Sequence, residues 1–79
     1  MTKDQALGLI SAALCKTLNK DTVTIDDKTD LIRDGIIDSL DSMVFLMELS
    51  AKIGKEVSDE DANDPEFFRV SQLVEFVEG

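Results

Sequence analysis

The sequence predicts an all-α fold with three main helices and one short helix. Three observations lead to this prediction: apolar residues recur with helical spacing, capping residues flank these runs, and no segment alternates like a strand. The chain has 79 residues, 43% of them hydrophobic. That length allows one small domain, which we assign to residues 1–79.

The first predicted helix covers residues 3–18. Its apolar positions follow helical spacing: Leu7, Ile10, Leu14 and Leu18. Thr2 is the expected N-cap, with Gln5 as its capping-box partner. Cys15 lies on the flank of the apolar stripe, where a thiol is expected to pack as a small hydrophobic group.

Residues 19–38 form a polar loop that carries its own aliphatic side chains: Val23, Ile25, Leu31, Ile36 and Ile37. Loops of this length in small domains are usually packed down or functional. We therefore expect the aliphatic residues to pin the loop onto the helices. Gly35 is expected to supply a turn with a positive φ.

The second helix is predicted to begin at Asp38-Ser39 and to end near Ile53, with Gly54 as its C-cap. It is apolar on two faces. One stripe contains Phe45, Leu46, Leu49 and Ile53; the other contains Leu40, Met43, Val44, Met47 and Ala51. The first stripe is expected to face the core. The second is either buried as well or available to a partner.

The C-terminal third is predicted to hold a short helical turn and a last helix. Pro65 fits the first position of the turn, with Asp64 as its cap. Ser71 is the expected N-cap of the last helix, which carries Leu73, Val74, Phe76 and Val77. The acidic cluster before and within the turn is interpreted as a solvated loop, with loose binding of divalent ions as the alternative: Asp59, Glu60, Asp61, Asp64 and Glu66.

The charge of the chain excludes several classes of function. Seventeen acidic residues against eight basic ones give a net charge of −9, which disfavours binding to nucleic acid or to an anionic membrane. The absence of histidine excludes histidine catalysis and histidine metal sites. The single cysteine excludes an internal disulfide. We expect a cytoplasmic, monomeric protein that is not an enzyme and has no resident metal.

The functional signal lies in the string from Leu31 to Ser42. Taken alone, Asp38-Ser39-Leu40 is an ordinary helix start, with Asp38 as N-cap. Here, however, the serine begins the second helix of a small acidic bundle, after a long loop that contains Asp34-Gly35. With the motif Asp38-Ser39-Leu40-Asp41, Pro65, Phe67-Phe68 and the closing helix, the chain resembles the acyl carrier protein family over nearly its whole length.

This resemblance implies a covalent cofactor. In the family, a phosphopantetheinyl transferase attaches 4′-phosphopantetheine to the serine of this motif, and the thiol of the arm carries acyl groups as thioesters. The implied attachment site is Ser39, and Asp38 is expected to help the transferase position its metal and the phosphate. The physics agrees, because a phosphodiester on Ser39 would lie at the positive end of the helix dipole.

The resemblance also implies that partner enzymes read the second helix. Apolar contacts are expected from Leu40, Met43, Val44 and Met47. The acidic residues Asp34, Asp41 and Glu48 are expected to meet basic residues of acyl-loading and acyl-processing enzymes, such as a synthase, transferase or ligase. Rim charges of this kind mainly speed and orient the encounter. We therefore favour partner contact over burial for the second apolar stripe.

The cargo stays open. Ile37 and Val44 depart from the pattern of housekeeping fatty acid synthesis, so the chain looks more like a free-standing carrier of a special pathway, whether fatty acid, polyketide or related. A D-alanyl, other aminoacyl or peptidyl carrier is an alternative, and an unmodified helical interaction module is another. An EF-hand fits poorly, because Ile32 stands at the third loop position.

Overall fold

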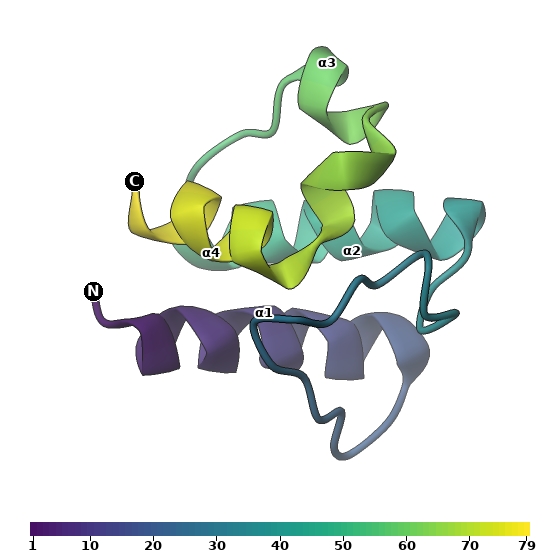
Figure 1. The fold of residues 1–79 in the computed structure, drawn as a ribbon, viewed down its shortest axis with the longest axis horizontal. Coiled ribbons are helices and arrows are strands. Elements are labelled where there is room, and N and C mark those ends of the chain that lie inside the picture. Colours follow the sequence, from purple (N-terminus) through teal and green to yellow (C-terminus); the bar gives the residue numbers. More distant parts are fainter.

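The computed structural model describes all 79 residues and confirms the all-α class (Figure 1). The elements are α1 (Lys3–Leu18), α2 (Ser39–Ile53), α3 (Asp59–Ala62), the 3₁₀ helix η1 (Pro65–Phe68) and α4 (Val70–Glu78). There is no strand, and the one β-type contact is an isolated bridge between Asp30 and Arg69. None of the helices combines the length and the apolar character that crossing a membrane requires.

The ends of α1 and α2 are capped as the sequence predicts. Thr2 and Gln5 form a capping box, in which each side chain accepts a hydrogen bond from the backbone N–H of the other residue. Gly54 ends α2 in the left-handed conformation with φ +66°. The two helices run side by side in opposite directions (Figure 1).

The core lies where α1, α2 and α4 meet, and fifteen hydrophobic residues are buried in it. Ile10, Phe45 and Leu73, one from each helix, are completely buried. On α2 the first apolar stripe faces this core: Phe45, Leu46 and Leu49 are buried, and Ile53 is half-buried. Phe67 of η1 adds edge-to-face contacts with Phe68 and Phe76. The sequence therefore assigned the core face of α2 correctly.

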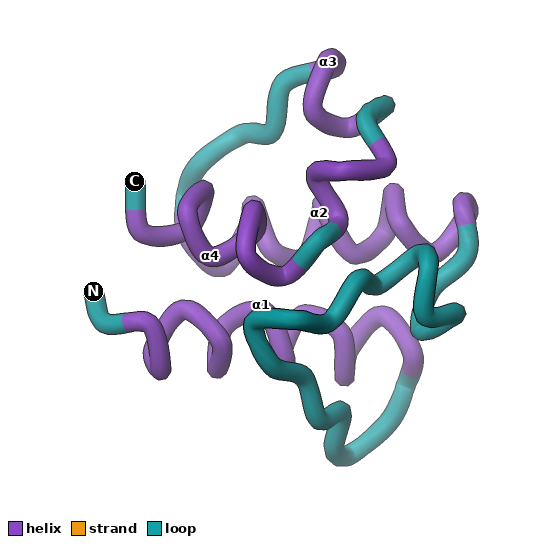
Figure 2. Tube along the Cα trace, viewed as in Figure 1, coloured by secondary structure: helices purple, strands orange, loops and turns teal.

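Figure 2 shows the path of the long loop between α1 and α2, and its aliphatic side chains pin it to the core, as expected. Leu31 is fully buried, Ile37 is buried, and Val23, Ile25 and Ile36 pack partly buried against the same cluster. Gly35 has φ +74°, which confirms its predicted turn.

Two backbone hydrogen bonds join this loop to the junction of η1 and α4. The N–H of Leu31 donates to the carbonyl of Phe68 at 3.0 Å, and the N–H of Val70 donates to the carbonyl of Thr29 at 2.9 Å. They flank the bridge between Asp30 and Arg69. The loop that leads to α2 is thereby held against the C-terminal part of the fold.

The prediction that Ser71 caps the last helix is wrong. The helix begins at Val70, and its N-cap is Arg69, whose side chain makes no capping hydrogen bond. The reason is tertiary: Val70 is buried and its N–H bonds to Thr29, so packing fixes the start of α4 without a side-chain cap. Asp64 and Pro65 do open the short helical turn, and the Asp64 carboxylate accepts a hydrogen bond from the N–H of Glu66.

A second short helix, α3, lies in the segment interpreted as a solvated loop. Ser58 caps it by accepting a hydrogen bond from the N–H of Asp61, and none of its four residues is buried. The acidic side chains are thus exposed or half-buried, as expected, but the backbone beneath them forms a helical turn.

One exposed ion pair ties the start of α1 to the loop. Lys3 Nζ donates to Asp27 Oδ2 at 2.7 Å. This hydrogen bond, with the attraction between the two charges, raises the pKa of Lys3 above its usual value and lowers the pKa of Asp27. Because both groups are in solvent, the pair is expected to add little to stability.

We predict that Leu31→Ala destabilises the whole fold, because Leu31 anchors the loop from a fully buried position. A buried Leu→Ala change costs about 2–5 kcal/mol. That cost is comparable with the roughly 3–5 kcal/mol that one core supplies in a chain of this size. Thermal unfolding followed by circular dichroism should show loss of the cooperative transition. The matched control, Leu40→Ala, removes an exposed leucine and should leave the transition unchanged; equal melting temperatures for both variants would refute the anchoring role.

Candidate functional site

Ser39 is the first residue of α2, and its side chain is exposed. Its hydroxyl makes no hydrogen bond within the protein, so it is free to react. Asp38, the N-cap, accepts a hydrogen bond from the N–H of Asp41 through Oδ1 at 2.8 Å. This bond fixes the first turn of α2 and leaves the other carboxylate oxygen, Oδ2, without a protein partner.

The position of Ser39 fits a phosphodiester. The first N–H groups of a helix lack intrahelical acceptors, and the helix dipole is positive at this end. An anionic group attached to the exposed hydroxyl would therefore be stabilised where it stands. A second serine lies one turn on, but Ser42 is buried and its hydroxyl donates to the carbonyl of Ser39 at 2.7 Å. The two serines thus have different roles, one free and one structural.

The second apolar stripe of α2 is exposed to solvent. The exposed fraction is 76% for Leu40, 68% for Met43, 46% for Val44 and 71% for Met47. We call these four side chains the α2 patch. The first of them, Leu40, directly follows Ser39 in the sequence. The burial alternative is therefore excluded for this stripe within the structure of the chain, and Ala51 at its end is exposed as well.

The three acidic residues predicted to meet partners lie in different settings. Asp34 is exposed in the loop, where its Oδ2 accepts a hydrogen bond from the N–H of Asp30 at 3.0 Å. Asp41 is half-buried in the first turn of α2. Glu48 is half-buried on α2 and forms an ion pair with Lys16 of α1, with Nζ and Oε2 3.5 Å apart. Glu48 is thus already engaged with the neighbouring helix.

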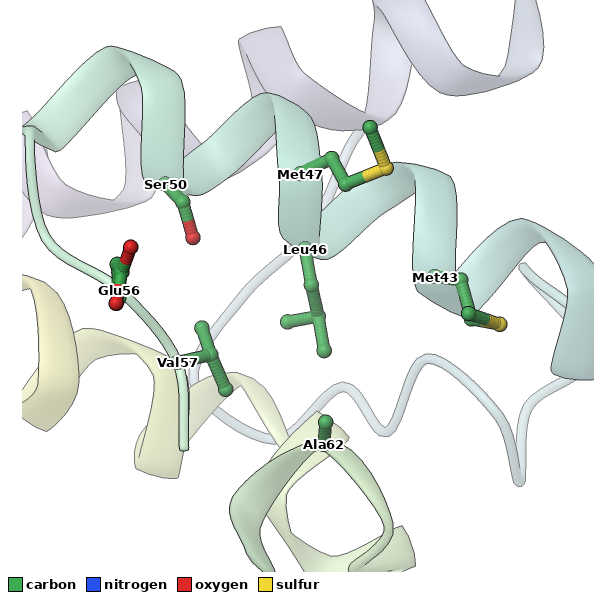
Figure 3. Close-up of a pocket in the computed structure, with 7 residues that line it drawn as sticks. All are labelled: Met43, Leu46, Met47, Ser50, Glu56, Val57 and Ala62. Carbon is green, nitrogen blue, oxygen red and sulfur yellow. The ribbon is translucent and has the colours of Figure 1, made fainter. Parts of the chain in front are cut away.

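A surface hollow of about 250 Å³ adjoins Ser39. It is lined by Ile32, Ser39, Ser42, Met43, Ala62, Asn63, Pro65 and Phe68. Met43 and Ala62 also line a larger groove of about 450 Å³ between α2 and the segment that includes α3 (Figure 3). The other residues of this groove are Leu46, Met47, Ser50, Glu56 and Val57. An apolar path therefore leads from Ser39 along α2.

Sequence reasoning missed most of this apolar groove. Helical spacing places Leu46 on the core stripe, and the residues across the groove from it belong to a segment that the sequence predicts to be polar. Val57 carried the one usable signal, because it is the single aliphatic residue in an acidic run. Figure 3 shows its side chain and that of Leu46 pointing into the same space.

No other chemistry-bearing cluster stands out. Cys15 is half-buried on α1. The structure brings no three Cys, Asp or Glu side chains together in a way that could hold a metal ion. In the segment tested as an EF-hand, Asp30 and Asp34 accept backbone hydrogen bonds that stabilise the turn.

Comparisons with known proteins identify a family that the chain matches. Residues 8–77 match the family described as "Phosphopantetheine attachment site". An acyl carrier protein of Helicobacter pylori strain ATCC 700392 / 26695 is 32% identical over 69 residues, which are 87% of this chain and 86% of that protein. Acyl carrier proteins of strains G27 and HPAG1 are 30% identical with the same coverage. No solved structure matches the chain significantly.

The match covers most of the chain and includes the long loop, α2 and the C-terminal helices. The defining feature of the matched family is the attachment of 4′-phosphopantetheine, which is therefore the covalent cofactor of the protein. The family is one of carriers rather than catalysts, whose members interact with biosynthetic enzymes and with a phosphopantetheinyl transferase. The chain belongs to the acyl carrier protein family.

Proposed function

We propose that Ser39 is the attachment residue and that the protein delivers acyl thioesters, held on the arm, to partner enzymes. The observation that carries the proposal is the exposed hydroxyl of Ser39 at the N-terminus of α2, without a protein partner. Three of the other five serines are engaged elsewhere, while Ser50 and Ser71 make no side-chain hydrogen bond and differ from Ser39 by lying outside the Asp38-Ser39-Leu40 motif. Ser42 is buried, Ser11 donates to the carbonyl of Val23, and Ser58 caps α3.

Asp38 is proposed to assist the modification. One of its carboxylate oxygens holds the first turn of α2, while Oδ2 remains available beside Ser39. A carboxylate oxygen in that position can contact the metal that accompanies the phosphate donor in the active site of the transferase. Asp38 would thus have two roles. One carboxylate oxygen would hold the first turn of α2, and the other would contact the metal in the transferase.

The α2 patch is proposed as the docking surface for partner enzymes. Its four side chains form an exposed apolar strip on the helix that carries Ser39 at its start. Asp34 in the loop and Asp41 and Glu48 on α2 supply acidic groups, which would attract basic residues of a partner. A small apolar contact with a charged rim suits weak and rapid exchange between enzymes.

Acyl groups are the proposed cargo, in fatty acid, polyketide or related specialised biosynthesis. The apolar groove reached from Ser39 through Met43 and Ala62 favours an acyl chain over an aminoacyl or peptidyl group, whose ammonium or amide groups would lose hydrogen bonds there. We place the protein in the cytoplasm, where a thiol stays reduced. The net charge of −9 opposes self-association, so the proposed state is a monomer.

We predict that Ser39→Ala abolishes modification. After incubation with a phosphopantetheinyl transferase and coenzyme A, intact mass measurement should show one added phosphopantetheinyl group on the unaltered protein and none on the variant. Ser42→Ala is the matched control, since it changes the nearest serine but leaves the free hydroxyl in place, and it should be modified. A wild-type protein that stays unmodified would favour the unmodified interaction module instead.

Asp38→Asn is predicted to slow the modification without unfolding α2. Asparagine caps a helix about as well as aspartate, so the change removes the charge and keeps the cap. Loss of a charge-assisted contact of about 1.5 kcal/mol corresponds to a roughly tenfold lower rate. The rate of phosphopantetheinyl transfer, with circular dichroism as the check of helicity, tests this role. An unchanged rate would assign Asp38 to capping alone.

Met47→Glu is predicted to leave the fold intact and to impair acyl transfer to or from partner enzymes. The side chain is 71% exposed, so an acidic group costs little in the free protein but would be buried against an apolar partner surface. Transfer rates for the modified protein measure the effect. Gln72→Glu, which adds the same charge at an exposed position on α4, should transfer normally. Equal loss in both variants would point to a general charge effect.

A further inference from the structure

A second, polar pocket adjoins the hollow at Ser39. It has a volume of about 260 Å³ and lies where the long loop meets η1. Its lining residues are Asp30, Ile32, Arg33, Pro65, Glu66 and Arg69. Ile32 and Pro65 also line the hollow that contains Ser39. Two paths therefore leave Ser39: the apolar groove along α2, and a path over Ile32 and Pro65 into this polar pocket.

The polar pocket holds the only two arginines of the chain. Arg33 is exposed, and its guanidinium has no ion-pair or hydrogen-bond partner within the protein. Arg69 donates one hydrogen bond, from an Nη atom to Glu66 Oε2 at 3.1 Å. Since a guanidinium has five N–H donors, most of the donors in this pocket are available to a ligand.

The pocket also has acceptors, and its formal charges cancel. Asp30 accepts a hydrogen bond from the backbone N–H of Arg33 through Oδ1, and Glu66 shares one contact with Arg69. The remaining carboxylate oxygens can accept further bonds. A lining whose formal charges cancel and which offers both donors and acceptors suits a neutral ligand with amide groups better than an anion.

We propose that this polar pocket is the resting site of the phosphopantetheine arm when the arm carries no cargo. The inference rests on Ser39 being the attachment residue. After its phosphate, the arm has a carbon with two methyl groups, then a hydroxyl, two amides and the thiol. The path from Ser39 has the same order, because apolar Ile32 and Pro65 come first and the charged side chains follow.

The alternative path is less suitable for the empty arm. The apolar groove offers mainly Met43, Leu46 and Val57, so amides placed there would give up hydrogen bonds with water and find few replacements. In the polar pocket, Arg33 and Arg69 donate to the amide carbonyls, while Asp30 and Glu66 accept from the amide N–H groups. Hydrogen bonding therefore directs the empty arm toward the junction of the loop and η1.

NMR spectroscopy of the modified protein tests this placement, after mass measurement has confirmed one arm on Ser39. With isotope-labelled protein and an unlabelled arm, we expect nuclear Overhauser effects between the two arm methyl groups and the methyl groups of Ile32. Attachment should also shift the backbone amide signals of Arg33 and Arg69. Arg33→Gln should reduce the shift at Arg69 at least twofold, whereas Lys28→Gln, an exposed change in the same loop outside the pocket, should preserve it.

Glu66→Gln gives an independent check from η1 and should also weaken the contacts between the arm and Ile32. Overhauser effects confined to Met43, Leu46 and Val57 would overturn the proposal, as would an arm with no contact beyond Ser39 and Leu40. Either result would leave the attachment at Ser39 intact. A protein that gains no arm at Ser39 would instead refute the proposed function, and this inference with it.

Discussion

The backbone bridge between the long loop and the start of α4 is the constraint on which the rest of the structure depends. Residues 19–38 could not order themselves, because they form no regular helix or strand of their own. The hydrogen bonds of Leu31 with Phe68 and of Val70 with Thr29, together with the buried Leu31 side chain, hold this loop. The loop in turn fixes where α2 begins, and therefore where Ser39 is presented.

The same bridge creates the surroundings of Ser39. Bringing the loop against η1 places Ile32 and Pro65 in the lining of both the surface hollow at Ser39 and the polar pocket. The two faces of α2 complete the arrangement. Phe45 and Leu49 bury one face in the core, while Met43 and Met47 leave the other exposed. An anchored helix with an exposed apolar face can present a tethered group and bind an enzyme at the same time.

Local signals predicted the parts of the fold that local interactions determine. The correctly predicted helix ends are fixed by contacts within a few residues. The capping residues are Thr2 with Gln5 for α1, Asp38 and Gly54 for α2, and Asp64 for η1. The start of α4 was not predicted correctly, because Val70 is positioned by Thr29, far away in the sequence. The helix α3 was missed because four residues without a buried side chain leave no apolar periodicity.

The candidate site shows the same division. Ser39 and Asp38 follow from a contiguous motif, and the exposed stripe follows from helical spacing. The hollows around them are lined by residues far apart in the sequence, such as Met43 with Ala62 and Ile32 with Pro65, and no pattern in the sequence indicates that these residues share a hollow. Glu48 shows what sequence-based prediction can and cannot give for a single residue. Its place on α2 was predictable, but its ion pair with Lys16 on α1 was not.

The attachment of the arm to Ser39 is the central claim, and peptide mass spectrometry after modification and tryptic digestion tests it most directly. Cleavage after Arg33 and Lys52 releases one peptide, residues 34–52, that contains Ser39, Ser42 and Ser50. We predict that fragmentation assigns the phosphopantetheinyl group to Ser39 alone. Assignment to Ser42 or Ser50, or an unmodified peptide, would contradict the account.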